Sequence, residues 1–344
     1  RPGPGQAFRP GRDQGTGLRG AVGIEPRQDG YARLVAGAGN DAARLQEAHG
    51  AGPILGSGGL AVIIPPSTLA VLLGSLARID IGALLIAGLI PGVILAFFYA
   101  VLIYAQVKID PDAAPFYDVP PVPLLHRLGI VVRDVLPMGV IVAAVIGSIL
   151  TGIATPTESG ALGALAVFVL ALIFRALSWD ALKKTIVDAT RVTGMTFLLI
   201  TASSTFAQLL AFSGASSGLV RWATGIEMDA TMMLIAMLLV LLLLGMFMDQ
   251  VSMMLITLPV FVPIALSLHY DMVWWGLVML LALEVSFTTP PFGLLLFVMQ
   301  GVAPAGTRLS EVAYAALPYI LCVFLLIGLL ILFPDLATWL PSRM

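Results

Sequence analysis

Two consecutive prolines interrupt an apolar run in the stretch Gly59-Leu-Ala-Val-Ile-Ile-Pro65-Pro66-Ser67-Thr-Leu-Ala-Val-Leu-Leu73. The pattern returns far along the chain in Val285-Ser-Phe-Thr-Thr-Pro290-Pro291-Phe-Gly293-Leu-Leu-Leu-Phe297. A further proline follows each copy at a similar separation, at Pro91 and at Pro318. Proline lacks a backbone donor and clashes with the preceding helical turn, so each pair ends a helix. We therefore expect two broken helices, each followed by a second apolar run.

The composition places these breaks in a membrane. Of the 344 residues, 59% are hydrophobic and 11% are charged, and the mean hydropathy is +0.99. A soluble domain carries about 25% charged residues. The net charge of −2 offers no basic surface for nucleic acid, and the single cysteine, Cys322, excludes an internal disulfide. The composition predicts an all-α polytopic membrane protein.

Nine apolar segments have roughly the 20 residues that a bilayer about 30 Å thick requires. They lie at 54–76, 82–106, 135–153, 158–177, 192–212, 229–248, 250–268, 272–303 and 313–333. For the segments that Gly, Pro or polar residues interrupt, the alternative to a full span is a re-entrant half-helix. The diprolines fall in segments one and eight, so an odd number of crossings separates them and the two copies point in opposite directions. This is the inverted-repeat arrangement of secondary transporters, which bind substrate between broken helices. The alternative is a pair of ordinary proline kinks.

The chain divides by composition into an arm, residues 1–53, and a transmembrane region, residues 54–340. The arm is rich in arginine and glycine and has no apolar periodicity, which predicts disorder. It is either a natural arm or sequence foreign to the parent protein. Within the transmembrane region, part of the first repeat covers 54–106 and the second covers about 135–334.

Two local patterns predict contact with the membrane surface. Residues 179–187 have the pattern of an interfacial amphipathic helix. They belong to the second of two basic stretches, 107–134 and 175–191, and basic stretches of this kind favour the cytoplasmic side of the membrane. Trp274 and Trp275 follow a short polar loop and Trp339 follows the last apolar segment, which predicts an aromatic belt at the membrane surface.

Three carboxylates interrupt or border the apolar runs, where an ionisable residue costs about 2.5–3.5 kcal/mol on insertion scales. Asp249 has no basic neighbour in sequence, so a bound cation or helix N-terminal amides must stabilise it. Glu158 follows Thr155-Pro156-Thr157 and is either part of a site or a helix-capping acid. Glu284 precedes the second diproline and is either functional or a hydrogen-bonding link to a neighbouring helix.

Four motifs together resemble the large membrane subunit of tripartite ATP-independent periplasmic (TRAP) transporters. They are Gly-Ser-Gly-Gly-Leu-Ala-Val-Ile-Ile-Pro-Pro-Ser (56–67), Gly-Ile-Ala-Thr-Pro-Thr-Glu (152–158), Gly-Met-Phe-Met-Asp (245–249) and Thr-Thr-Pro-Pro-Phe-Gly (288–293). They occur in the family's order across roughly residues 53–340.

The resemblance implies a sodium-coupled importer of organic anions, carboxylates or acid sugars, in the bacterial inner membrane. It implies no enzymatic activity and no cofactor apart from Na⁺ as coupling ion. The partners that it implies are a small membrane subunit, a periplasmic substrate-binding protein and the lipid bilayer. It also implies a scaffold and a transport region that moves as an elevator.

The resemblance carries over to this chain a set of sodium- and substrate-binding residues. Asp249 is the expected Na⁺ ligand. The other candidates are Ser57, Gly58, Pro65, Pro66, Ser67, Thr155, Pro156, Thr157, Glu158, Thr289, Pro290, Pro291 and Gly293.

One departure from the family concerns the N-terminal side. The family's subunit has further spans and a re-entrant hairpin with a Gly-Ser-Ser motif before the first diproline, where this sequence has the Arg/Gly-rich arm. The resemblance therefore implies an incomplete first repeat and no transport by this chain alone.

Two other functions are weighed against this one. A sodium/dicarboxylate-type carrier or an anion exporter of similar architecture would work without a binding protein. An intramembrane protease would need a membrane histidine or a second membrane aspartate, and the apolar segments have neither.

Overall fold

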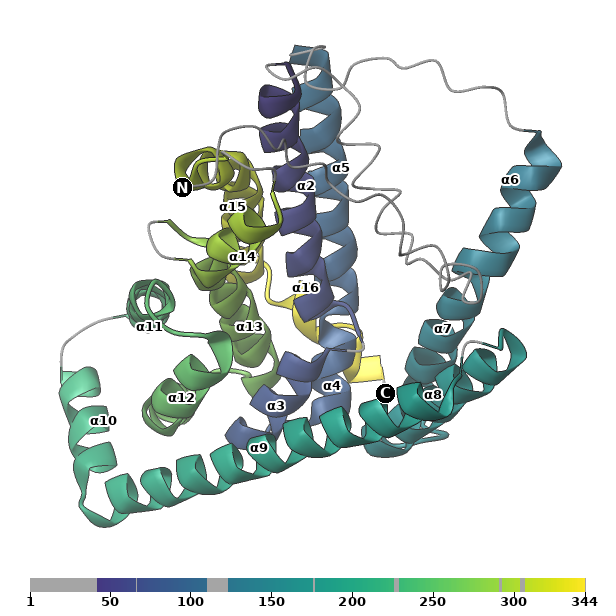
Figure 1. Cartoon of the computed structure of the whole chain (residues 1–344). Helices are drawn as coiled ribbons and strands as arrows, with labels where there is room; N and C mark the ends of the chain where they lie inside the picture. Colours follow the sequence, from purple (N-terminus) through teal and green to yellow (C-terminus); the bar gives the residue numbers. More distant parts are fainter. Residues whose placement is uncertain are drawn as a thin grey trace, which may run out of the picture. The chain divides into compact units, whose positions relative to one another are not determined.

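The computed structural model describes residues 42–65, 67–109, 123–175, 177–225, 229–290, 293–303 and 307–343 (Figure 1). Every regular element in these ranges is helical, which confirms the all-α class. The elements are α2 (Ala42–Ile63), α3 (Thr68–Ala77), α4 (Ile81–Ala87), α5 (Leu89–Ile109), α6 (Leu124–Ile130), η2 (Val131–Val135), α7 (Leu136–Leu150), α8 (Pro156–Ile173), α9 (Trp179–Phe212), α10 (Ala215–Gly225), α11 (Ala230–Gly245), α12 (Gln250–Ser267), α13 (Met272–Thr288), α14 (Leu294–Val302), α15 (Leu309–Leu332), α16 (Asp335–Thr338) and η3 (Pro341–Arg343).

Each of the nine apolar segments contains helix in the described ranges. Within the described ranges, five stretches are long and apolar enough to cross a membrane: Ile81–Ile109, Pro156–Ile173, Trp179–Phe212, Gln250–Ser267 and Leu309–Leu332. A sixth is a bent pair, Ala51–Ile63 with Thr68–Ala77. Three more apolar helices are shorter: Gly139–Leu150, Ala230–Gly245 and Met272–Thr288. The chain is therefore a polytopic membrane protein.

Both diprolines lie at breaks between helices. α2 and α3 meet at an angle of 43° around Pro65, and α13 ends at Thr288 while α14 begins at Leu294. α2 begins at Ala42, before the expected boundary at residue 54, and residues 1–41 lie outside the described part. The inverted orientation of the repeats and an elevator movement stay predictions.

The α13 helix is packed against α3, α4, α11, α12, α14, α15 and α16. Its sequence is apolar all round, as expected of a helix enclosed by others. Trp274 and Trp275 are accordingly buried, with 8% and 0% of their surface exposed, and Trp274 donates from Nε1 to the Leu330 carbonyl at 2.7 Å. The prediction of an aromatic belt at these two residues is therefore wrong.

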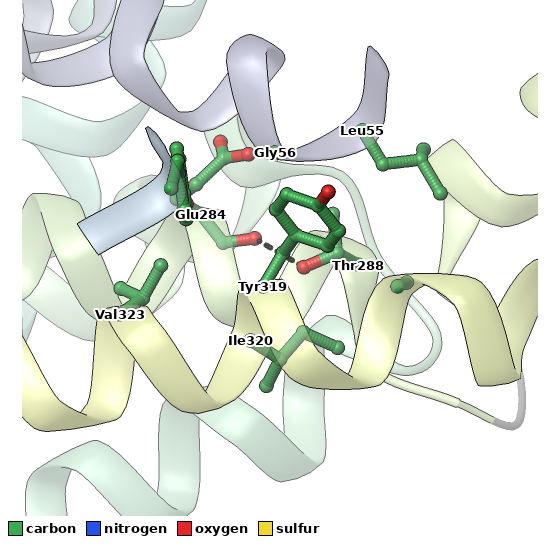
Figure 2. A pocket seen from close by; sticks show the side chains of 9 residues that line it. Leu55, Gly56, Glu284, Thr288, Tyr319, Ile320 and Val323 are labelled. Carbon is green, nitrogen blue, oxygen red and sulfur yellow. Dashed lines mark hydrogen bonds between the residues drawn. The ribbon is translucent and has the colours of Figure 1, made fainter. Parts of the chain in front are cut away.

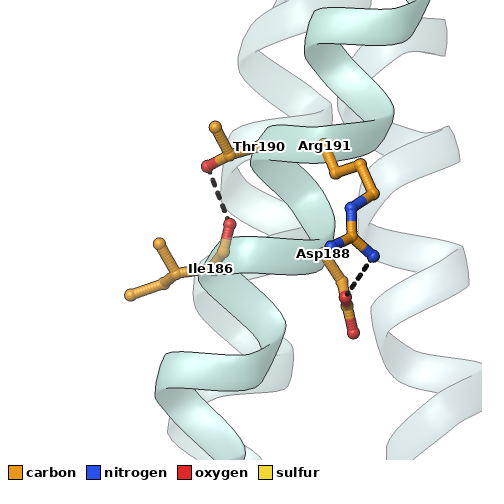
Figure 3. A network of polar contacts seen from close by, with 4 residues as sticks. All are labelled: Ile186, Asp188, Thr190 and Arg191. Carbon is orange, nitrogen blue, oxygen red and sulfur yellow. Dashed lines mark hydrogen bonds and ion pairs between the residues drawn. The ribbon is translucent and has the colours of Figure 1, made fainter.

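The α9 helix also differs from the prediction made for residues 179–187. Residues 179–187 are not a separate interfacial helix but the beginning of a single helix that runs from Trp179 to Phe212. Ser178 caps its first turn, and no proline or glycine ends it before the apolar segment begins. On its exposed surface Asp188 and Arg191 pair at 4.0 Å, one turn apart (Figure 3). An exposed pair of this kind contributes little stability.

Candidate functional site

Asp249 lies in the short connection between α11 and α12, where it caps α12. Its Oδ2 accepts hydrogen bonds from the amides of Val251 and Ser252 at 3.0 and 3.1 Å, and its Oδ1 accepts one from the Ser252 hydroxyl at 2.5 Å. The carboxylate is exposed. Helix N-terminal amides therefore stabilise its charge, which is one of the two ways that the sequence allowed.

A cavity of about 300 Å³ opens beside this carboxylate. Its lining joins the connection before α12 to the beginning of α14, and consists of Met246, Phe247, Met248, Asp249, Ser252 and Leu294. Leu294 is the first residue after the second break. The structure thus places Asp249 next to the α14 end of this break, although the two are far apart in sequence.

Backbone carbonyls gather at the second break. The Thr289 hydroxyl donates to the Val285 carbonyl at 2.6 Å, and the Gly293 amide donates to the Thr289 carbonyl at 3.0 Å. A Cβ on Gly293 would lie only 2.8 Å from the carbonyl oxygens of Phe287 and Thr289. The absence of a side chain at Gly293 thus leaves these oxygens accessible. Pro290 is half-buried in the break, and Pro291 lies outside the described residues.

At the first break, hydrogen bonds of Ser67 connect the end of α2 to the start of α3. Ser67 is buried, accepts at Oγ from the Ala70 amide at 3.2 Å and donates to the Val62 carbonyl at 2.5 Å. Pro65 is also buried, and Pro66 lies outside the described residues. None of these residues lines the Asp249 cavity. Ser67 is thus engaged in joining α2 to α3.

The Ser67 hydroxyl gives a first testable prediction. Ser67→Ala removes the cap of α3 and leaves the buried Val62 carbonyl without its donor, so we expect a loss of about 1–3 kcal/mol of stability. Ser75→Ala is the control, because the exposed Ser75 hydroxyl only donates to Val71 within α3. The thermal unfolding midpoint of the purified transporter should fall for Ser67→Ala alone. Equal midpoints for both variants would contradict this role.

Ser57 and Gly58 are exposed on α2 and do not line the Asp249 cavity. The Ser57 hydroxyl donates to the Ile54 carbonyl at 2.9 Å within the helix. A Cβ on Gly58 would meet no atom within 4 Å among the described residues. Both positions are therefore accessible, but the structure does not bring them to Asp249.

Residues 155–158 form a capping box at the start of α8. The Thr155 hydroxyl accepts from the Glu158 amide at 3.3 Å, and the Glu158 carboxylate accepts from the Thr155 amide at 2.8 Å. Pro156 follows as the first helical residue, and neither Thr157 nor its neighbours line the Asp249 cavity. Glu158 thus has the capping role that the sequence left as an alternative.

Two residues that join Asp249 to the rest of the site are not predicted from the sequence. Ser252 binds the carboxylate, and its spacing of three from a capping aspartate could have indicated this. Gln250 donates from Nε2 to the Leu283 carbonyl at 3.3 Å and to the Glu284 carboxyl at 3.1 Å. These bonds connect the start of α12 to α13. No sequence pattern indicates that Gln250 contacts residues more than 30 positions away.

Comparisons with known proteins identify the family of this chain. Residues 45–336 match the family model described as "Tripartite ATP-independent periplasmic transporter, DctM component". The chain is 30% identical over 297 residues to the C4-dicarboxylate TRAP transporter large permease protein DctM of Pseudomonas aeruginosa, an alignment that covers 86% of this chain and 68% of that protein.

Two further relatives carry other names. The Ectoine TRAP transporter large permease protein TeaC of Halomonas elongata is 30% identical over 291 residues, covering 83% of this chain and 66% of the relative. The Sialic acid TRAP transporter permease protein SiaT of Haemophilus influenzae is 26% identical over 281 residues, covering 81% and 44% respectively.

Proposed function

Because this chain belongs to the DctM component family of the tripartite ATP-independent periplasmic transporters, we propose that it forms the membrane path of a sodium-coupled importer of organic anions. The observation that carries the proposal is the second break. There Asp249 and Ser252 share a cavity with Leu294, and the carbonyl oxygens of Phe287 and Thr289 lie beside Gly293. No enzymatic step is needed, since the relatives are transporter permeases.

Sodium fits the donor set at this break. The carbonyl oxygens of Phe287 and Thr289 lie at the C-terminal end of α13, where the helix dipole is negative. Unwound carbonyls and half-helix C-terminal ends are the groups that hold Na⁺ in secondary transporters. We place the ion between these oxygens and the Asp249–Ser252 pair.

The anionic substrate fits the opposite end of the same break. The first residue of α14, Leu294, lines the cavity, and Gly293 leaves the helix without a side-chain cap. Free amides at a helix N-terminus attract a carboxylate. The three relatives described above are named for C4-dicarboxylates, ectoine and sialic acid, each of which has a carboxyl group. A carboxylate is therefore the group that we assign to this helix end.

The family name also supports the expected partners. We propose that a small membrane subunit completes the permease in the bacterial inner membrane and that a periplasmic binding protein delivers the substrate. Because an ion crossing 100 mV gains about 2.3 kcal/mol per charge, co-transport of sodium supplies energy for accumulation.

Uptake into proteoliposomes tests this proposal. We expect the complete transporter to accumulate a labelled carboxylate only with an inward sodium gradient and with its binding protein, and to lose uptake when potassium replaces sodium. Sodium-driven uptake that persists without the binding protein would instead support a sodium/dicarboxylate-type carrier. Efflux without sodium would support an anion exporter.

A further inference from the structure

A second cavity lies apart from the Asp249 site, between α2, α5, α13 and α15. Its residues are mostly apolar, and Figure 2 shows the side chains of Glu284 and Tyr319 directed toward α2. The cavity measures about 10 Å³, which is close to the minimum for one water molecule. Its lining consists of Leu55, Gly56, Tyr99, Glu284, Thr288, Ala316, Tyr319, Ile320 and Val323.

Glu284 is the only carboxylic acid among these lining residues, and 5% of its surface is exposed. Its Oε2 accepts from Gln250, whereas among the described residues no hydrogen bond to Oε1 is found. A Cβ placed on Gly59 would lie 3.3 Å from Oε1 and 3.5 Å from the Tyr99 hydroxyl. Glu284 Oε1 and the Tyr99 hydroxyl oxygen therefore both lie beside Gly59 of α2.

Among the described residues, the groups around Glu284 do not include a positive charge. Facing the cavity from α5 and α15 are the phenols of Tyr99 and Tyr319, whose rings lie 5.3 Å apart, and Gln250 faces it from α12. Cys322 on α15 lies near both tyrosines. The charged caps of the helices packed around α13 are exposed and do not line the cavity: Arg78, Asp80, Asp229, Asp249, Arg308, Glu311 and Asp335.

We propose that Glu284 is a proton-binding site, with its neutral carboxyl donating to a single water in this cavity. A carboxylate that is buried without a counter-charge takes up a proton rather than remain ionised. The Thr288 hydroxyl donates its hydrogen to the carbonyls of Glu284 and Val285, so it is not a donor to the Glu284 carboxyl. The proton comes from water and leaves to water, and no other bond changes.

This site connects the two broken helices. Glu284 touches α2 at Gly59 ahead of the first break, and its own helix leads into the second break. Gln250 links it to the start of α12, next to Asp249. A neutral carboxyl holds these segments together, whereas an ionised one places an unpaired charge against α2. The inference does not depend on sodium binding, because it concerns a separate cavity.

Infrared difference spectroscopy of the purified complete transporter tests the inference. At neutral pH we expect a carbonyl stretch band of a protonated carboxyl that is lost in Glu284→Gln and kept in Glu311→Gln, which removes an exposed capping carboxyl. Replacing potassium with sodium should leave the band unchanged. A spectrum that Glu284→Gln does not alter, or a band that sodium abolishes, would overturn the proposal.

A second variant covers the case in which Glu284→Gln does not assemble. Gln250→Leu keeps the carboxyl and removes the donor to Oε2, so the same band should shift to higher frequency. An unshifted band would mean that it does not arise from Glu284, and the assignment would fail.

Discussion

Asp249→Asn should raise the sodium concentration for half-maximal uptake at least tenfold in the complete transporter. The amide can still accept the bonds from Val251 and Ser252 that cap α12, but it lacks the charge that attracts the ion. A tenfold change corresponds to about 1.4 kcal/mol. Sodium-dependent uptake of a labelled carboxylate into proteoliposomes measures the effect.

The matched control is Asp271→Asn. Asp271 caps α13 as Asp249 caps α12, by accepting from the amides of Val273 and Trp274 at 2.9 Å. It does not line the Asp249 cavity. Its variant should therefore keep the sodium dependence of the unmodified transporter. An equal shift in both variants would mean that capping, not ion binding, explains the result for Asp249.

The second large effect concerns the contact between α11 and α13. A Cβ on Gly245 would overlap the Ser286 side chain and would lie 2.9 Å from its carbonyl carbon. Gly245→Ala must therefore push α11 and α13 apart where they are in contact, and we expect a loss of about 1–3 kcal/mol or more of stability. The yield and the thermal unfolding midpoint of the solubilised transporter should both fall.

Gly328→Ala provides the comparison for this variant. A Cβ on Gly328 in α15 meets no atom within 4 Å among the described residues. Alanine in an open helical position should be neutral or stabilising by up to about 1 kcal/mol. If the two alanine variants unfold at the same temperature, the close packing of Gly245 on Ser286 is not present in the protein.

The sequence predicts the helical class and both breaks because these depend on local chemistry. Apolar runs of fixed length predict helices in a bilayer, and consecutive prolines end them wherever they occur. The same local reasoning separates residues 179–187 from the rest of α9 and places Trp274 at the membrane surface. The first prediction is wrong because no proline or glycine ends α9 before the apolar segment begins. The second is wrong because other helices enclose Trp274, and no local pattern records such packing.

The candidate site is predicted less completely for the same reason. Asp249 and the second diproline stand out as polar or helix-breaking positions within apolar runs. Asp249 lines the same cavity as Leu294, which begins the helix after the second diproline, and Gln250 donates to Glu284. Both contacts join parts of the chain that are distant in sequence. The motif around Ser67 gives no indication that its hydroxyl is engaged in closing the first break.

The central claim is that sodium binds at the carbonyl oxygens of the second break. Titration of the purified transporter with sodium or potassium at constant ionic strength, followed by thermal unfolding, tests it most directly. We predict a saturable stabilisation by sodium alone, which Gly293→Ala abolishes because its Cβ fills the space between the carbonyls of Phe287 and Thr289. Gly301→Ala, in an open position of α14, should retain it. Equal stabilisation by potassium, or a full sodium effect in Gly293→Ala, would contradict the account.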